Sequence, residues 1–355
     1  MNDPVGRIRR RLGELGADAA LLTNLAHVRW STGFTGSNGV ALVDGTRVVF
    51  VTDPRYAEQA RLECPDNEVV VTSGSFPEAL RANSSPYGRI VLDALSLTVA
   101  QYRELARQFH ESDLMIEAGW LDVEVARKQR SEIERIAAAQ ALTDDVFARL
   151  LEYLRPGVTE RQVAAEIVYL HLQAGADRMS FEPIVASGPN GAFPHGRPGS
   201  RVLRDCEPVV IDMGCYLDGY ASDMTRTVHI GPATNEFAET YKVVLEAQQL
   251  AIGIARSGLR ADELDGVARA FLVDAGLGDY FVHSLGHGLG LDVHEWPRIG
   301  RNSEYVLPDS CVVTIEPGVY LPGKWGIRIE DIVVLSPEGC RNLTRSSSAL
   351  LELDG

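Results

Sequence analysis

The sequence of 355 residues predicts an α+β protein with a smaller N-terminal α/β domain and a larger, internally duplicated C-terminal domain. The chain is longer than one hydrophobic core usually supports. Short apolar strings alternate with helical stretches over residues 19–115. Beyond residue 123, a pattern of two helices followed by two strands occurs twice. We therefore expect domains at residues 1–122 and 123–355.

The N-terminal domain is predicted to begin with an amphipathic helix and to continue with alternating strands and helices. Val5, Ile8, Leu12 and Leu15 recur at helical spacing. Four strings read as strands, at 18–23, 39–53, 67–73 and 88–93, and helices are expected at 54–63 and 98–109. Asp44-Gly45 predicts a hairpin turn, because this pair tolerates positive φ angles.

The C-terminal domain is predicted to begin with two helices. The first runs over residues 131–154 and stops at Pro156-Gly157, because proline cannot continue a helix. The second begins at Thr159, which forms a plausible capping box with Gln162, and ends before Gly175.

An internal repeat is the strongest observation within the chain itself. Residues 154–177 resemble 255–279 at an offset of 101, and VVIDMG at 209–214 resembles VTIEPG at 313–318. Asp212 thereby falls opposite Glu316, and Asp223 falls opposite Glu330. Each half would contribute a helix pair and antiparallel strands carrying two carboxylates. Such a duplication predicts one domain with a central site.

These acidic residues, with one histidine, form a candidate site for two divalent metal ions. Two ions in one site lie about 3.5–4 Å apart and need carboxylates from more than one strand. Oxygen and imidazole ligands suit Mn²⁺, Co²⁺ or Zn²⁺. A lone carboxylate is more often a solvated acid at a strand end, whereas the combination indicates metal. The five candidate ligands are Asp212, Asp223, His287, Glu316 and Glu330.

The string around His287 allows two interpretations. His283, His287 and His294 fall within twelve residues, although any single one could be a packed core histidine. GHGLG at 286–290 could form a phosphate cradle, but it lacks the lysine of that motif. The alternative is that its glycines let the backbone approach the metal ions.

Composition and charge exclude several classes of protein. The net charge of −15 leaves no basic stripe to neutralise phosphates, so no nucleic-acid partner is expected. No apolar run approaches the roughly 18 residues of a membrane span. Five widely spaced cysteines fit reduced thiols. We expect a cytoplasmic protein that acts on small molecules or peptides and has no membrane partner.

Five strings carry a resemblance to a known family: 181–196, 212–227, 283–298, 314–320 and 326–331. They resemble the metallopeptidases of the pita-bread fold, in particular the proline-specific branch that contains prolidase and aminopeptidase P. The resemblance covers nearly the whole chain. It implies a pita-bread catalytic domain behind a creatinase-like N-terminal domain, and a homodimer.

The resemblance also implies a role for each matching residue. Asp212 would bind one metal ion, Asp223 and Glu330 would bridge both, and His287 and Glu316 would bind the second. Glu316 would shuttle a proton to the leaving proline nitrogen. The catalytic residues would be Glu316, His195 and His294, and the substrate-binding residues would be His283, Arg298, Arg328 and Tyr320.

The expected activity is hydrolysis of the bond before a proline at the second position of a peptide. Arg298 resembles the arginine that binds a dipeptide's carboxylate, although it could be an ordinary surface arginine. This resemblance favours an Xaa-Pro dipeptidase over an Xaa-Pro aminopeptidase. A catalytically silent binding module, and a lyase or amide hydrolase on the same scaffold, are the alternatives from other classes.

Overall fold

The computed structural model describes residues 3–354 and forms two compact units that divide between Val125 and Ala126. This division falls inside the short helix α6 (Asp122–Ala126), where the sequence predicted a boundary at 122/123. Each unit has its own hydrophobic core. None of the helices in the described part of the chain is both long and apolar enough to span a membrane.

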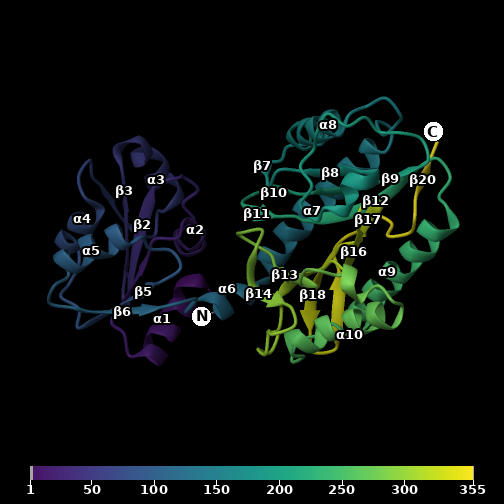
Figure 1. Ribbon diagram of the computed structural model, residues 1–355. Helices are drawn as coiled ribbons and strands as arrows, with labels where there is room; N and C mark the ends of the chain where they lie inside the picture. The colour runs from purple at the N-terminus through teal and green to yellow at the C-terminus, as the bar shows by residue number, and fades with distance from the viewer. Residues whose placement is uncertain (1–2, 355) are drawn as a thin grey trace. The chain divides into compact units, whose positions relative to one another are not determined.

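The N-terminal unit, drawn in purple to blue in Figure 1, contains a six-stranded mixed sheet. Its strand order is β4-β3-β2-β1-β5-β6. The β1–β2 and β2–β3 pairs are antiparallel, and the other three pairs are parallel. Its strands are β1 (Ala19–Leu22), β2 (Gly39–Asp44), β3 (Val48–Thr52), β4 (Glu68–Val71), β5 (Arg89–Asp93) and β6 (Asp113–Glu117). Its helices are α1 (Pro4–Leu15), α2 (Leu25–Thr32), α3 (Ala57–Glu63), α4 (Phe76–Ala82) and α5 (Val99–Gln108), with a 3₁₀ turn η1 at Pro54–Tyr56.

The predicted elements of this unit are confirmed, but the reason given for the β2–β3 turn is wrong. Neither Asp44 nor Gly45 has a positive φ. The Asp44 carboxylate instead closes the turn by accepting hydrogen bonds from the backbone N–H groups of Thr46 and Arg47, both at 2.8 Å. The sequence reasoning also missed α2, α4 and β6.

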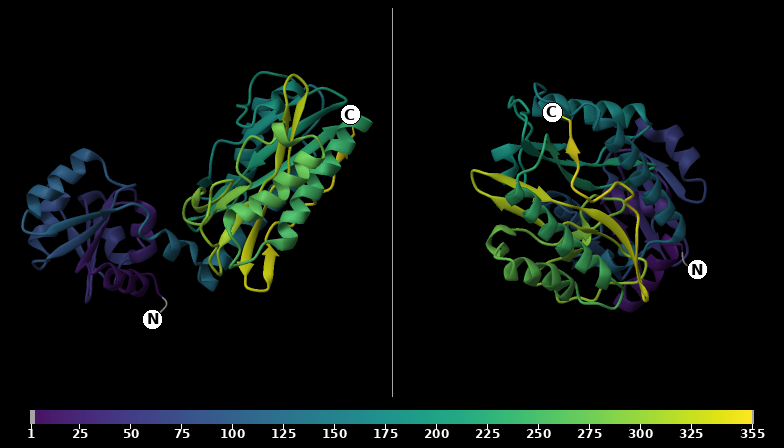
Figure 2. Two further views of the ribbon diagram at one scale, coloured as in Figure 1. Left: turned by 60° about the horizontal axis from the view of Figure 1, so that its bottom comes forward. Right: turned by 90° about the vertical axis from the view of Figure 1, so that its right-hand side faces the viewer.

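The C-terminal unit consists of two helix pairs and the strands that follow each pair. Helix α7 (Arg130–Leu150) packs against α8 (Glu160–Gln173), and α9 (Asn235–Ile254) packs against α10 (Ala261–Asp274), as Figure 2 shows for the second pair. The capping box of Thr159 and Gln162 is present. The predicted first helices are therefore confirmed, and α7 ends four residues earlier than expected.

The strands of this unit form a four-stranded sheet, β20-β12-β9-β8, a five-stranded sheet, β14-β13-β15-β18-β19, and two smaller sheets, β11-β10-β7 and β16-β17. Two 3₁₀ turns, η2 (Gly188–Ala192) and η3 (Gly278–Tyr280), lie in the connecting loops. The strands are β7 (Arg178–Met179), β8 (Ile184–Ser187), β9 (Glu207–Met213), β10 (Cys215–Leu217), β11 (Tyr220–Ala221), β12 (Met224–Ile230), β13 (Gly286–Gly288), β14 (Glu295–Ile299), β15 (Val312–Ile315), β16 (Gly318–Leu321), β17 (Trp325–Arg328), β18 (Asp331–Ser336), β19 (Gly339–Asn342) and β20 (Glu352–Leu353).

The predicted duplication is confirmed at the level of these elements. The first helix pair precedes the antiparallel strands β9 and β12, and the second precedes the antiparallel strands β15 and β18. Asp212 lies in β9 and Asp223 directly precedes β12, while Glu316 directly follows β15 and Glu330 directly precedes β18. The repeat thus brings the four carboxylates to the ends or edges of two strand pairs.

Candidate metal centre

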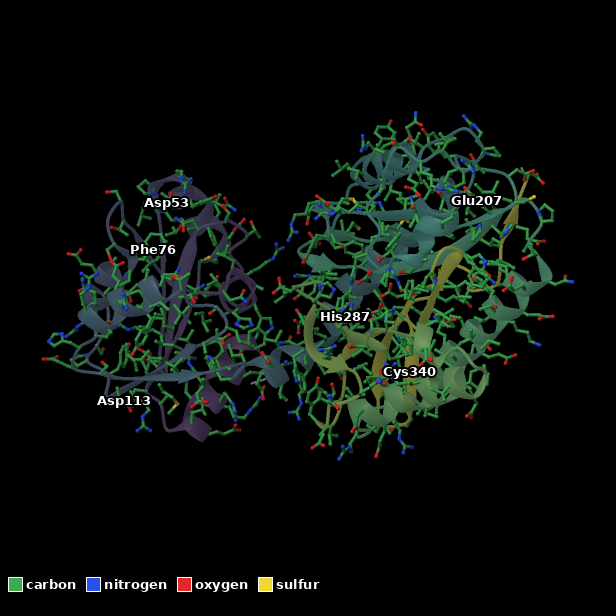
Figure 3. All side chains as sticks on the ribbon, viewed as in Figure 1. Asp53, Phe76, Asp113, Glu207, His287 and Cys340 are labelled. Atoms are coloured by element: carbon green, nitrogen blue, oxygen red, sulfur yellow. The ribbon has the colours of Figure 1, made fainter. Side chains whose placement is uncertain are left out.

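The five predicted ligands line one cavity of about 570 Å³ in the C-terminal unit. One ligand atom each from Asp223, His287 and Glu330 lie within 4.8 Å of one another. The His287 Nε2 atom lies 3.6 Å from Asp223 Oδ2 and 3.5 Å from Glu316 Oε1. His287 is labelled in Figure 3. The structure therefore brings together the residues that the repeat and the histidine string predicted.

The connection between Asp212 and Asp223 depends on a tight turn and on one close backbone approach. Asp218 and Gly219 have φ angles of 51° and 74°, the positive values that a tight hairpin turn requires. The strands β9 and β12 then pair so that Thr225 lies opposite Asp212. A Cβ atom on Gly214 would lie 2.1 Å from the carbonyl oxygen of Ser222, so glycine is required there.

His287 presents one ring nitrogen to the acidic cluster. Its Nδ1 donates to the carbonyl oxygen of Gly288 at 3.0 Å, which leaves Nε2 as the acceptor. Burial, together with the neighbouring His294, lowers the pKa of His287 to about 4. The imidazole is therefore neutral at pH 7 and its Nε2 lone pair is available to a metal ion.

Buried hydroxyl and guanidinium groups orient the carboxylates. Thr225 Oγ1 donates to Glu330 at 2.7 Å, and Thr314 Oγ1 donates to Glu316 at 3.3 Å. Arg328 donates from Nη2 to Asp212 Oδ2 at 2.5 Å and from Nε to Thr225 at 3.0 Å. The sequence reasoning missed both threonines, although each lies two residues from a predicted ligand.

The acidic cluster is electrostatically unfavourable without a cation. Asp212, Asp223 and Glu330 are at most 9% exposed. Burial, reinforced by the charges of neighbouring carboxylates, raises the pKa of Asp223 and of Glu316 well above their usual range. The same causes raise the pKa of Glu330 to about 8. The buried Asp212 Oδ1 has no hydrogen-bond partner among the described residues.

These properties fit a site for hard divalent cations. Four carboxylates and one neutral imidazole supply the oxygen and nitrogen ligands that such cations prefer. A cation would neutralise the repulsion that raises the carboxylate pKa values, and it would satisfy the unpaired Asp212 oxygen.

The glycines on either side of His287 are required by strand packing. A Cβ atom on Gly286 would lie 2.0 Å from the Thr314 carbonyl oxygen, and one on Gly288 would lie 2.4 Å from that of Trp296. These glycines therefore let β13 pack between its neighbours β15 and β14. That they also let the backbone approach the metal ions stays a prediction.

The predicted substrate residues lie at different depths. His195, His283, His294 and Arg298 line the cavity, and the His294 ring centroid is 4.4 Å from that of His287. Tyr320 lies behind this lining: its hydroxyl donates to His283 Nε2 at 2.9 Å and accepts from Arg328 Nη1 at 2.7 Å.

Arg328 also lines the cavity, but its guanidinium is committed to protein groups. Besides Asp212, Thr225 and Tyr320, it donates to the Pro194 carbonyl oxygen at 3.1 Å. Strand β17 ends at Arg328, and Glu330 lies in the connection between β17 and β18. These contacts allow Arg328 to hold Asp212 and the His195 segment in place.

An apolar wall completes the cavity, and the sequence reasoning did not identify it. Phe181, Pro183, Ile184, Pro194 and Pro198 line the side contributed by β8 and its flanking loops. The cavity therefore joins an apolar surface to the carboxylate cluster and to the exposed guanidinium of Arg298.

Comparison with known proteins places the chain among peptidases. Over 97% of both chains, it is 36% identical to the Xaa-Pro dipeptidase of Lactobacillus delbrueckii subsp. lactis. An Xaa-Pro dipeptidase structure from Bacillus anthracis superposes with a TM-score of 0.94 at 34% identity, covering 99% of both chains. The X-Pro aminopeptidase structure from Thermotoga maritima gives 0.92 at 35% identity, covering 99% of this chain and 100% of that one.

The two units match two family descriptions. Residues 4–123 match the creatinase/prolidase N-terminal domain. Residues 134–337, more than half of the chain, match metallopeptidase family M24, and this segment contains all five candidate ligands. The protein is a member of metallopeptidase family M24, with the pita-bread fold and a smaller creatinase-type N-terminal domain.

Proposed function

We propose that the protein is a dinuclear-metal Xaa-Pro dipeptidase, with residues 1–122 as the N-terminal domain and 123–355 as the catalytic domain. The observation that carries the proposal is a single cavity that contains a buried carboxylate–histidine cluster, an apolar wall and the exposed Arg298. A dipeptide ending in proline has a scissile carbonyl, an apolar ring and a carboxylate, which correspond to these three features.

Asp212, Asp223, His287, Glu316 and Glu330 would hold two divalent ions, Mn²⁺, Co²⁺ or Zn²⁺. When bound, such ions lower the pKa of water and polarise a carbonyl. Glu316, whose carboxylate lines the cavity beside His287, takes up a proton and passes it to the leaving proline nitrogen. His294, next to His287, donates a hydrogen bond to the carbonyl oxygen as negative charge develops on it.

The remaining residues bind and orient the substrate. The apolar wall takes the proline ring, whose tertiary amide has no N–H to donate. The Arg298 guanidinium donates to the dipeptide's carboxylate, an interaction that suits the planar arginine fork. His195 and His283 flank the peptide, and Tyr320 holds His283 through their hydrogen bond. Arg328 keeps Asp212 oriented.

An Xaa-Pro aminopeptidase is the second candidate, because a further cavity adjoins Arg298 and leaves room for a longer peptide. We propose that the protein acts in the cytoplasm as a homodimer, without nucleic-acid or membrane partners. The five free cysteines and the net charge of −15 support this environment, and the dimer rests on the family resemblance.

Hydrolysis of Leu-Pro by metal-stripped protein that has been reloaded with Mn²⁺ tests the proposal. We expect activity only after reloading, and none in the Asp223→Asn variant. The exposed Asp309→Asn variant is the matched control and should retain full activity. Failure of the reloaded protein to cleave Leu-Pro, alongside cleavage of a non-proline substrate, would contradict the proposal.

A further inference from the structure

A second cavity, of about 660 Å³, adjoins the metal-site cavity in the C-terminal unit. The two cavities share His283, Ser284 and Arg298 as lining residues. Arg298 therefore lies at their junction. Arg301 and Asn302, which follow on the chain after β14, line only the second cavity.

The wall between the cavities is held by a buried ion pair. Arg269 and Asp265 on α10 form two hydrogen bonds of 2.7 and 2.8 Å. Arg269 also donates to the carbonyl oxygens of Phe281 and His283 at 3.0 and 2.8 Å, and Asp265 accepts from the Leu285 N–H at 3.0 Å. The segment 281–285 is thus fixed from behind, and the second cavity is preformed.

Two arginines that line this cavity have guanidinium N–H groups that donate no hydrogen bond to a described residue. Arg298 donates from Nε to Ser284 Oγ at 2.6 Å, and neither of its terminal nitrogens has a hydrogen bond to another described residue. The exposed side chain of Arg301 likewise has no hydrogen bond or ion pair with any residue that the structure describes. Arg269 is neutralised by Asp265, and Asp279 is the single carboxylate that lines this cavity. The cavity therefore favours an anionic group.

Gly300 keeps the junction open beside Arg298. A Cβ atom at this position would lie 3.0 Å from Ser284 Oγ and 3.7 Å from Arg298 Nε. A side chain here would press on the hydrogen bond that orients the Arg298 guanidinium. With glycine, the donors of Arg298 remain reachable from both cavities.

We propose that the second cavity receives the residue that follows proline in a tripeptide, and that Arg301 binds its terminal carboxylate. One added residue moves that carboxylate by about 3.5 Å, away from Arg298. Arg298 then donates to the proline carbonyl oxygen in a tripeptide, as it donates to the carboxylate of a dipeptide. This inference rests on the proposed Xaa-Pro activity and assigns the enzyme both substrate lengths.

The test compares Leu-Pro, Leu-Pro-Gly and Leu-Pro-Gly amide as substrates of the Mn²⁺-reloaded full-length protein. We expect Arg301→Gln to raise KM for Leu-Pro-Gly about tenfold with kcat little changed, because the carboxylate contact is the same in the ground and transition states. KM for Leu-Pro and for the uncharged amide should not change. Arg341→Gln, at an exposed position on β19, is the matched control and should leave all three KM values unaltered.

The outcomes separate this inference from the proposed function. If the wild-type protein cleaves Leu-Pro but not Leu-Pro-Gly, the second cavity does not accept the extra residue and only the inference fails. The same holds if Arg301→Gln leaves KM for Leu-Pro-Gly unchanged, or raises KM for Leu-Pro equally. If the wild-type protein cleaves neither peptide, the proposed activity fails first and the inference fails with it.

Discussion

Asp223 illustrates why the acidic cluster needs a cation. It is 4% exposed and lies 3.6 Å from His287, and burial and the charge of Glu330 are the largest causes of its raised pKa. Asparagine has nearly the same shape but no charge. Asp223→Asn should therefore raise the thermal stability of the metal-free protein, because it removes a buried carboxyl group that is costly to ionise in a repulsive cluster.

The same substitution should weaken Mn²⁺ binding at least about a hundredfold, since even indirect partners of metal ligands contribute factors of 10–100. Calorimetric titration with Mn²⁺ and a melting curve in EDTA measure the two effects. Asp309→Asn should change neither. Wild-type Mn²⁺ affinity in the Asp223→Asn variant would exclude Asp223 as a ligand.

The raised pKa of Glu330 predicts an unusual pH dependence for the stability of the metal-free protein. Its pKa rises from a usual value of 4.5 to about 8 in the folded state, so the folded protein binds more protons than the unfolded chain between these values. The contribution of Glu330 to the stability of the metal-free protein should then be full below about pH 4.5 and be lost as the pH rises toward 8. Urea denaturation at several pH values measures this slope.

Mn²⁺ should flatten the slope, because a bound cation favours the ionised carboxylates. Glu330→Gln should flatten it without metal, because glutamine does not titrate. An identical slope in the wild-type protein and in Glu330→Gln would show that the pKa of Glu330 is not raised in the folded state.

The sequence predicted the five clustered residues but not the groups that orient them. The residue types that bind metals and the internal repeat can both be read from the amino-acid sequence, so Asp212 could be matched to Glu316. The hydrogen bond from Thr225 to Glu330 joins residues 105 positions apart, and it depends on how the two strand pairs approach each other. Such a contact has no local pattern, which is why it was missed.

At the scale of elements, the loop 188–200 that carries His195 depends on one buried carboxylate. Glu160 on α8 is fully buried, and its two oxygens accept hydrogen bonds from Ser187 N–H and Oγ, from Asn190 Nδ2 and from Gly199 N–H at 2.8–3.1 Å. Glu160 therefore ties the two ends of the loop to α8, while Arg328 holds its middle at Pro194.

Glu160→Gln should loosen this loop, because the new amide presents hydrogen atoms to at least one existing donor. We expect a loss of about 1–3 kcal/mol of stability and faster amide hydrogen exchange in residues 188–200. KM for Leu-Pro should rise severalfold, whereas Mn²⁺ affinity should stay unchanged because Glu160 touches none of the acidic cluster.

A matched variant distinguishes this loop effect from a general loss of stability. Asp144 is also a buried acid, and it accepts hydrogen bonds from the N–H groups of Arg345 and Ser346. Asp144→Asn should speed hydrogen exchange near residues 345–348 and leave that of the His195 loop unaltered. Equal effects of both variants on KM would contradict a specific role for Glu160.

In the N-terminal unit, the elements that the sequence did not predict are short or half exposed. The predicted strands β1, β2 and β3 are almost entirely buried, and their apolar runs identified them. Helices α2 and α4 have only eight and seven residues, too few to be stable alone, so packing against the sheet determines them. Strand β6 is half exposed at the sheet edge and carries a correspondingly weak pattern.

At the scale of the whole molecule, the sequence predicted two units because one core could not bury a chain of this length. The N-terminal core surrounds β1 and β5, whereas the C-terminal unit has one core for each half of its repeat. All residues of the acidic cluster lie in the C-terminal unit. Metal binding should therefore act on the stability of that unit.

This arrangement predicts that Mn²⁺ separates the unfolding of the two units in scanning calorimetry of the full-length protein. A ligand at a hundred times its dissociation constant stabilises the folded state that binds it by about 2.7 kcal/mol. Mn²⁺ should raise the melting temperature of the transition that unfolds residues 126–355 and leave that of residues 3–125 in place, and EDTA should reverse the shift.

Hydrogen exchange during heating assigns each transition, through peptides of β1–β5 for the N-terminal unit and of β9–β18 for the C-terminal unit. The Asp223→Asn variant should melt identically with and without Mn²⁺. An equal Mn²⁺-dependent shift of both transitions would show that the two units unfold as one cooperative block, and that the separate cores do not confer separate stabilities.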